Sequence, residues 1–151
     1  MRTLIQKITA AGAFGAMLMS GALAQAATTL PPIHKMGSVE YLSGGIGLDE
    51  SRAIESASHQ WPLILEFVAK DGQHASFLTD VQVRVRDAKG HTTLEATSDG
   101  PFLLAKLPPG RYSVDATVGG KTLYENVVIR QHQPAKAVFV WWAADAHRGA
   151  S

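Results

Sequence analysis

The side chains that could take part in metal or thiol chemistry are few and scattered. The chain has no cysteine, which excludes a thiol nucleophile and a thiolate metal site. Its six histidines are His34, His59, His74, His91, His132 and His147. None has the close spacing to a second ligand that a local metal motif requires. The sequence therefore predicts no metal site, no cofactor and no catalytic constellation.

A glycine-rich segment, SGGIG at residues 43–47, is the main candidate for a binding loop. It lacks the lysine and hydroxyl residue of a phosphate-binding loop, and Asp49 and Glu50 would repel phosphate. Adjacent carboxylates do not face each other on a helix, so these two favour complementing the positive end of a helix. The segment is either a turn leading into that helix or a loop that touches a partner. The candidate binding residues are Tyr41, Gly44, Gly45, Gly47, Asp49, Glu50 and Trp142.

Trp142 is a candidate because of its expected direction. Adjacent strand residues point to opposite faces, so Trp141 would join the core and Trp142 would lie outside with Val138 and Val140. Other apolar residues at outward positions are Ile64 and Val68. Either a helix covers this patch, or the patch is a surface for a partner or a second copy.

The elements that would position these residues follow from two apolar periods. Ile54, Ala57 and Trp61 share one face of a short helix over residues 48–61, and Pro62 ends it. From residue 62 the period changes to two, with turn residues between the runs. The predicted strands are residues 62–69, 80–87, 91–97, 101–106, 110–118, 121–130 and 135–142. This spacing favours a β-sandwich or barrel.

The first 26 residues have the pattern of a signal peptide. Arg2 and Lys7 precede an uncharged apolar run over residues 8–23, and AQA at residues 24–26 fits a cleavage site. We expect a periplasmic protein with no integral membrane segment after cleavage; secretion and a retained N-terminal anchor are the alternatives. Removing residues 1–26 leaves 12 basic residues (14 minus Arg2 and Lys7) and 13 acidic ones. Such a near-neutral chain favours neither nucleic acid nor anionic membrane surfaces as partners.

One stretch carries a family resemblance. It runs from Val81-x-Val83-x-Val85-x-Asp87 through Thr97-x-Asp99-Gly100-x-Phe102 to Leu107-Pro108-Pro109-Gly110-x-Tyr112-x-Val114. This pattern resembles the carboxypeptidase regulatory-like domain, over residues 62–142. The resemblance implies an all-β fold, a seven-stranded antiparallel transthyretin-like β-sandwich, here with one short N-terminal helix. Residues 27–61 would then be a flexible leader, the glycine-rich loop and the helix, and residues 143–151 a flexible tail.

The resemblance implies a non-catalytic role. Members of this family that occur without a peptidase domain are associated with adhesion, with carbohydrate or protein contact, and with structural support. We therefore expect a binding or structural module for an envelope protein or glycan. An assembly subunit that pairs through an edge strand, and weak homo-oligomerisation, are alternatives.

Two chemical alternatives stay open. The end HRGAS, residues 147–151, is similar to the end of 5-hydroxyisourate hydrolases, which share the transthyretin-like fold, but it has an inserted Ala150 and His147 in place of tyrosine. A small hydrolase is therefore the enzyme alternative. Lys70 and Asn126, with a buried Glu66, would supply the groups of a lysine–asparagine crosslink found in some bacterial sandwiches.

Overall fold

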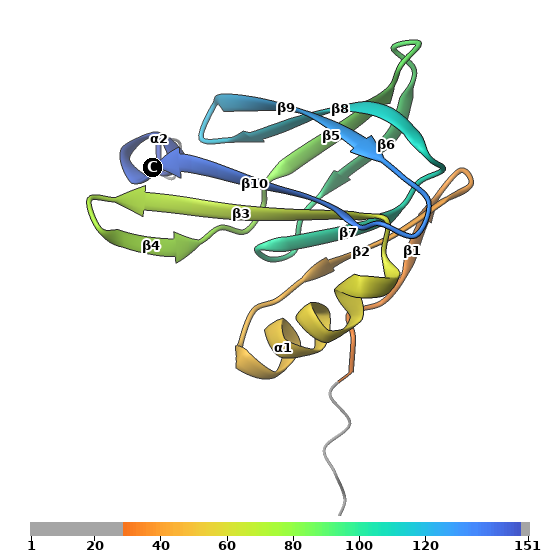
Figure 1. The fold of residues 1–151 in the computed structure, drawn as a ribbon. Helices are drawn as coiled ribbons and strands as arrows, with labels where there is room; N and C mark the ends of the chain where they lie inside the picture. Colours follow the sequence, from red (N-terminus) through yellow and green to blue (C-terminus); the bar gives the residue numbers. More distant parts are fainter. Residues whose placement is uncertain (1–28, 149–151) are drawn as a thin grey trace, which may run out of the picture.

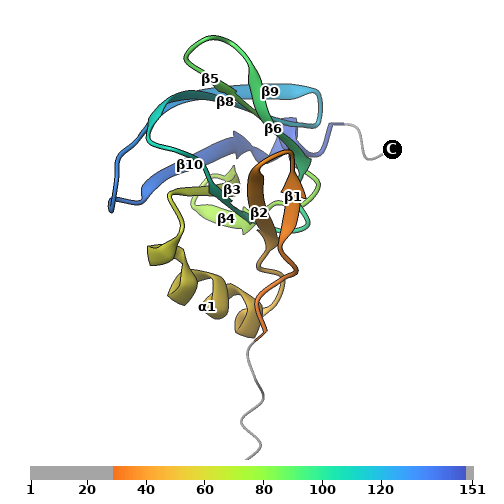
Figure 2. The same cartoon turned by 90° about the vertical axis from the view of Figure 1, so that its right-hand side faces the viewer.

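The computed structural model describes residues 29–148. These residues form two mostly antiparallel β-sheets that pack face to face as a sandwich-like β fold, and a short helix lies on the outer side of the larger sheet (Figures 1 and 2). Within the described range, no helix is both long and apolar enough to cross a membrane.

The larger sheet, sheet A, has the strand order β1-β2-β7-β3-β10, and β4 pairs with the second half of β3. Its strands are β1 (His34–Met36), β2 (Val39–Gly44), β3 (Leu63–Asp71), β4 (His74–Phe77), β7 (Phe102–Lys106) and β10 (Ala135–Trp142). β10 runs parallel to β3 over its whole length, and the other pairs are antiparallel. No other strand of residues 29–148 pairs with the second edge of β10.

The smaller sheet, sheet B, has the order β6-β5-β8-β9 and is entirely antiparallel. Its strands are β5 (Gln82–Asp87), β6 (Thr92–Thr97), β8 (Gly110–Val118) and β9 (Lys121–Ile129). Successive strands β8 and β9 are joined by Gly119 and Gly120, both with positive φ. Glycine adopts this conformation without the steric cost that a β-carbon brings, which explains the tight hairpin.

The core between the sheets follows the predicted alternation. The side chains of Leu63, Leu65 and Phe67 on β3 are fully buried, and Phe67 packs against Phe139 and Trp141 of β10. Trp141 is 2% exposed, and its indole Nε1 donates to the Lys121 carbonyl over 3.1 Å. The inward assignment of Trp141 is therefore confirmed.

The predicted helix is also confirmed. It consists of α1 (Leu48–Ala57) followed by a short 3₁₀ helix, η1 (Ser58–Gln60), and ends before Pro62. Ile54 and Trp61 are buried against the outer face of sheet A, in a second apolar cluster that is separate from the core between the sheets. The cluster's other members are Leu42, Ile64, Phe102 and Leu104.

Three corrections concern the strands. All seven predicted strands exist, as β3 and β5 to β10, but β1, β2 and β4 bring the described total to ten. β1 and β2 lie within the segment assigned to a flexible leader and loop, and β4 lies between the predicted strands 62–69 and 80–87, where no strand was predicted. The expectation of a wholly antiparallel sandwich is wrong at β10, which pairs parallel with β3.

The predicted flexible tail also needs a correction, because residues 143–146 form a short helix, α2 (Ala143–Ala146). The predicted signal peptide, residues 1–26, and residues 149–151 lie outside the described residues.

Candidate functional site

The glycine-rich loop is held against the turn that precedes β7. The Ser43 hydroxyl accepts a hydrogen bond from the Asp99 backbone N–H over 3.0 Å and lies 3.3 Å from the Asp99 carboxylate. A β-carbon on Gly100 would collide with the Gly44 backbone, so the two chain segments touch directly. Gly100 is explained by this close approach, and a β-carbon on Gly44 would collide instead with the side chains of Glu50 and Pro31, so neither glycine needs a ligand to explain it.

Glu50 closes the same loop from the helix side. Its carboxylate oxygen accepts a hydrogen bond from the Gly45 N–H over 2.7 Å, and it lies in the first turn of α1, where negative charge is favoured. Gly47 is the residue before the helix and has φ 87°. These contacts support the turn interpretation of residues 43–47.

The remaining predicted site residues do not gather around the loop. Tyr41 is half-buried on β2, with its ring 5.5 Å from that of His34, and Asp49 is exposed. Trp142 lies on β10, which β7 and β3 separate from β2. The structure therefore does not unite the seven candidates in one site.

The outer face of sheet A is divided into a covered and an open half. α1 covers the half that contains Ile64, which is buried. In Figure 1, α1 lies below β2, β7 and the beginning of β3, and the β4 end of the sheet is free of it. The prediction that a helix covers the outward apolar residues is thus confirmed for Ile64 and wrong for Val138, Val140 and Trp142, which are 43%, 48% and 65% exposed.

The open half carries a contiguous apolar surface. Val140 of β10 pairs in register with Val68 of β3, and Val68 pairs with Phe77 of β4, so the three share one row on one face. Phe77 is 60% exposed. Val138 and Trp142 lie on either side of Val140 along β10. We call this surface, formed by Val68, Phe77, Val138, Val140 and Trp142, the apolar patch.

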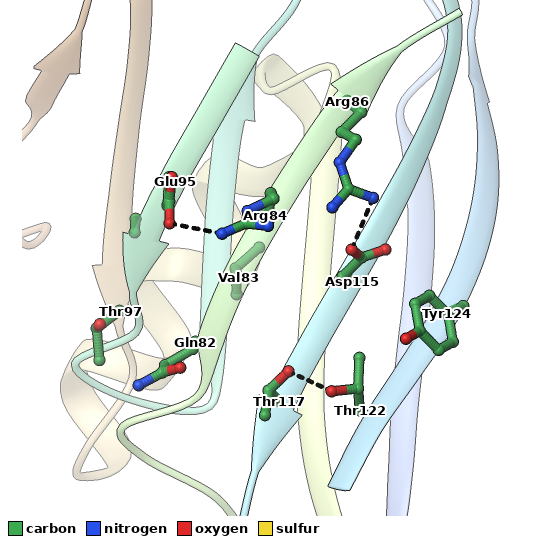
Figure 3. A pocket seen from close by; sticks show the side chains of 11 residues that line it. Gln82, Val83, Arg84, Arg86, Glu95, Thr97, Asp115, Thr117, Thr122 and Tyr124 are labelled. Carbon is green, nitrogen blue, oxygen red and sulfur yellow. Dashed lines mark hydrogen bonds and ion pairs between the residues drawn. The ribbon is translucent and has the colours of Figure 1, made fainter. Parts of the chain in front are cut away.

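The outer face of sheet B has the opposite character. Its strand registers align polar side chains in rows across the strands. The first row is Thr97, Gln82, Thr117 and Thr122. The second row is Glu95, Arg84, Asp115 and Tyr124. The third row is Arg86, Ser113 and Asn126. Figure 3 shows most of these side chains around a shallow hollow of about 650 Å³. We call these rows the polar face.

Some groups of the polar face are paired and others are not. Arg84 lies 3.1 Å from Glu95, and Arg86 lies 2.9 Å from Asp115, so the four charges cancel. Two further groups, the Thr117 and Thr122 hydroxyls, share a hydrogen bond of 2.7 Å. No hydrogen bond joins the side chains of the five remaining residues to another residue of the range 29–148. Three of them, Gln82, Thr97 and Tyr124, line the hollow, and the other two are Ser113 and Asn126. The Tyr124 residue is 71% exposed and supplies the aromatic ring at the edge of the hollow.

The described residues contain no local set of metal ligands and no buried side-chain nitrogen or oxygen without a partner. His147 and Arg148 do line a hollow, with Thr79 and Asp80. The Thr79 hydroxyl, however, donates a hydrogen bond to the Asp80 carboxylate over 3.0 Å, and Arg148 forms an ion pair with Asp145 over 2.8 Å. No hydrogen bond links His147 to a hydroxyl in the described part of the chain, so no nucleophile–base pair is formed there.

The proposed lysine–asparagine crosslink is excluded by the fold. Lys70 is exposed on the outer face of sheet A, whereas Asn126 is exposed on the outer face of sheet B. The whole core lies between them. Glu66, the expected promoter, is paired instead with Lys136 over 3.0 Å.

Tyr112, the aromatic residue of the LPPGRY stretch, has a structural role. Its ring is buried, and its hydroxyl donates to the Pro108 carbonyl over 2.7 Å. Burial raises the pKa of Tyr112, and the nearby negative charge of Asp87 raises it further. The pKa of Asp87 is itself lowered, mainly because its carboxylate accepts the His91 backbone N–H. Both residues fasten turns at one end of sheet B.

The polar face was not anticipated from the sequence. The sequence does contain polar residues that alternate with the apolar ones on β5, β8 and β9, but such a pattern is equally typical of any sheet face exposed to solvent. Only the register shows that Gln82 is flanked by Thr97 and Thr117, and that Tyr124 joins the row of Asp115.

Comparison of the chain with protein-family models and with curated proteins finds no match.

Proposed function

We propose that this protein is a non-catalytic, exported binding module that holds a neutral glycan of the cell envelope on the polar face of sheet B. We also propose that its sandwich has the transthyretin-like topology of carboxypeptidase regulatory-like domains, which the stretch from Val81 to Val114 resembles. The observation that carries the glycan proposal is the set of registered polar rows bordered by the exposed ring of Tyr124.

The unpaired groups favour a ligand rich in hydroxyls. The Gln82 amide can donate and accept, and the Thr97 hydroxyl can do the same, so a polyol can exchange several hydrogen bonds with one row. The Tyr124 ring offers an apolar surface beside these groups, and its hydroxyl remains available for hydrogen bonding. A sugar ring has a C–H face and a rim of hydroxyls, which matches both features.

The charges favour a neutral ligand over an anionic one. Each arginine of the face has a carboxylate partner, Arg84 with Glu95 and Arg86 with Asp115. A phosphate or sulfate group would have to displace one of these carboxylates from its arginine. A neutral hydroxyl can instead accept from an arginine N–H that points away from the pair.

The test is a titration of the ¹⁵N-labelled protein with cellohexaose, maltohexaose and chitohexaose, followed by backbone amide shifts. We expect one of these neutral oligosaccharides to shift the amides of β5, β8 and β9 at the polar face. Tyr124→Ala should weaken the binding about two- to twelvefold, since an aromatic contact contributes about 0.5–1.5 kcal/mol. Tyr124→Phe keeps the ring and should retain most of the affinity.

Val128→Ala is the matched control, because Val128 is also an exposed residue of β9 but does not line the hollow. It should leave the titration unchanged. Amide shifts on sheet A alone, or no saturable shift with any of the three oligosaccharides, would overturn the glycan proposal.

Export has its own test. The signal-peptide pattern supports cleavage after Ala26, and N-terminal sequencing of the protein from a periplasmic fraction should begin at Ala27. An N-terminus upstream of Ala27 would favour a retained anchor, and recovery from the culture medium would favour secretion.

The hydrolase alternative is supported by one observation, the hollow that His147 and Arg148 line with Asp80. Asp80 also has φ 58°, an uncommon backbone conformation for a non-glycine residue. The decisive assay is hydrolysis of 5-hydroxyisourate by the purified protein beside His147→Ala. Turnover that the variant abolishes would replace the glycan proposal with an enzyme.

A further inference from the structure

The apolar patch on sheet A has a symmetric arrangement of neighbours. Its central row is Val140, Val68 and Phe77. Along β3, Glu66 and Lys70 lie two residues before and after Val68, and therefore on the same face. Along β10, Val138 and Trp142 lie two residues before and after Val140. Each of these residues thus has, in the other half of the patch, a counterpart of opposite charge (Glu66 and Lys70) or of different size (Val138 and Trp142).

The charges on β3 are unequally satisfied. Glu66 pairs with Lys136 over 3.0 Å. Lys70 is exposed and makes no ion pair with another residue of the range 29–148. It lies beside Trp142, its register partner on β10. The patch therefore has an unpaired cation at one end and, at the other, a partly exposed carboxylate that already pairs with Lys136, with apolar side chains between them.

We propose that the occupant of the apolar patch is a second copy of this chain, packed face to face about a twofold axis. The axis would run across the strands along the row of Val140, Val68 and Phe77. Because the row lies along this axis, it packs on the same row of the second copy. The rotation also reverses the strand direction, so that residues before and after the row exchange places. It also brings Glu66 opposite Lys70 of the second copy, and Val138 opposite Trp142 of the second copy.

The self-complementarity is what selects a second copy over another protein. An isologous contact requires that the same surface fit itself, with unlike groups at positions related by the axis. Here both β3 and β10 meet that requirement, one through charge and the other through a large and a small apolar residue. Face-to-face sheets pack about 10 Å apart with nearly aligned strands, a geometry in which these pairs can meet.

The placement of α1 leaves the patch accessible. In Figure 1 the helix lies under the beginning of β3, and the β4 end of sheet A extends past it. In Figure 2 the helix is again on the side of sheet A that faces away from sheet B. A second copy can therefore approach the β4 end without displacing the helix.

The proposal does not depend on the glycan site. The apolar patch is on sheet A and the polar face is on sheet B, so the two surfaces point away from each other. A dimer formed through sheet A would present two polar faces on its outside. Either proposal can fail while the other holds.

The experiment is sedimentation equilibrium of the purified protein over a range of concentrations. We expect a reversible monomer–dimer equilibrium. Val140→Glu places a charge at the centre of the contact, and we expect it to raise the dimer dissociation constant at least about tenfold, as for other central interface positions. Val128→Glu, which makes the same substitution at an exposed position on sheet B outside the polar face, should leave the constant unchanged.

A charge exchange tests the predicted orientation. Lys70→Glu would place a carboxylate opposite Glu66 of the second copy, and the repulsion should weaken the dimer. Lys89→Glu, on the exposed β5–β6 turn, should leave the dimer unchanged. Adding Glu66→Lys to Lys70→Glu restores unlike charges across the axis and should recover affinity. Both exchanged residues are on the sheet surface, and circular dichroism checks that each variant remains folded.

Three results would overturn the proposal. They are a monomer at every concentration, a dimer that Val140→Glu does not weaken, and a double variant no tighter than Lys70→Glu alone. The last result would place a dimer contact elsewhere or in another orientation.

Discussion

Gly100 lies directly against the backbone of Gly44, although the two residues are 56 positions apart in the chain. Gly44 is the last residue of β2, and Gly100 lies in the turn before β7. This contact joins the glycine-rich loop to the turn before β7, beside the Ser43–Asp99 hydrogen bonds. It shows why a segment with the composition of a ligand loop is part of the framework. The stability of the protein, rather than its affinity for a ligand, should respond to changes there.

Gly100→Ala tests this contact. The new β-carbon would collide with the Gly44 backbone, which cannot move as a side chain can, so we expect the free energy of unfolding to fall by about 1–3 kcal/mol. Urea denaturation measures the change. Gly110→Ala is the control, because its β-carbon would meet only ordinary contacts with the Tyr112 ring, the nearest at 3.6 Å. Equal effects at the two positions would contradict the explanation.

Glu50 and Asp49 form a second matched pair. Both carboxylates are in the first turn of α1, but only Glu50 accepts the Gly45 N–H. We expect Glu50→Ala to lower the free energy of unfolding by about 1 kcal/mol, the usual effect of losing such a capping bond. Asp49→Ala should have a smaller effect. If Asp49→Ala costs as much as Glu50→Ala in urea denaturation, the hydrogen bond to the loop is not what matters.

The two adjacent tryptophans should differ sharply. Trp141 is buried between the sheets, and Trp141→Ala should lower the free energy of unfolding by about 3–5 kcal/mol or prevent folding. Trp142→Ala should change the free energy of unfolding of the monomer by less than about 0.5 kcal/mol, because the side chain is largely exposed. Thermal unfolding at low protein concentration, followed by circular dichroism, separates these outcomes. A large loss from Trp142→Ala in the monomer would mean that its ring is covered within the chain.

Tyr112→Phe removes the hydroxyl that donates to Pro108. We expect a loss of about 1 kcal/mol at neutral pH, the net contribution of one such hydrogen bond. The difference should shrink in alkali. Because burial raises the pKa of Tyr112 above the ordinary value of 10.0, the unfolded chain loses this proton first. The stabilising effect of the neutral phenol is therefore complete below pH 10 and falls as the pH rises through the folded-state pKa.

Urea denaturation of the wild type and Tyr112→Phe between pH 8 and pH 11 measures this linkage. A difference between the two proteins that is constant with pH, or that grows above pH 10, would show that the phenol of Tyr112 is not stabilised in its neutral form.

The sequence predicted the parts of this fold that depend on side-chain period. Leu63, Leu65 and Phe67 alternate because one face of β3 is buried, and the same signal located β5, β8 and β10. The turn residues between the runs located β6, β7 and β9. β4 was not predicted because all four of its residues are exposed, so its sequence has no alternation of apolar and polar residues. β2 was not predicted because it ends at Gly44, which lies against Gly100, a contact that the apolar period of a sequence cannot report.

The alternation of apolar residues could not predict the relative direction of the paired strands or their register. Alternation says which face Val140 occupies, but it does not say that β10 runs parallel to β3 or that Val140 pairs with Val68. The loop that follows β9 brings the chain back across the edge of the sandwich into sheet A, and parallel pairing follows from that path. Both candidate surfaces are products of register, which explains why only Trp142 among the predicted binding residues lies on either one.

The pairing of β3 with β10 also bears on how the chain folds. These strands are separated by the whole of sheet B in the sequence, so their contacts have a high contact order. β3 cannot gain its parallel neighbour until residue 142 has been synthesised, and until then the ring of Phe67 lacks the Phe139 and Trp141 rings against which it packs. Proteins dominated by such non-local pairing fold in about milliseconds to seconds. A chain that stops before β10 would keep an unsatisfied strand edge and an incomplete core, and would be a ready substrate for chaperones and proteases.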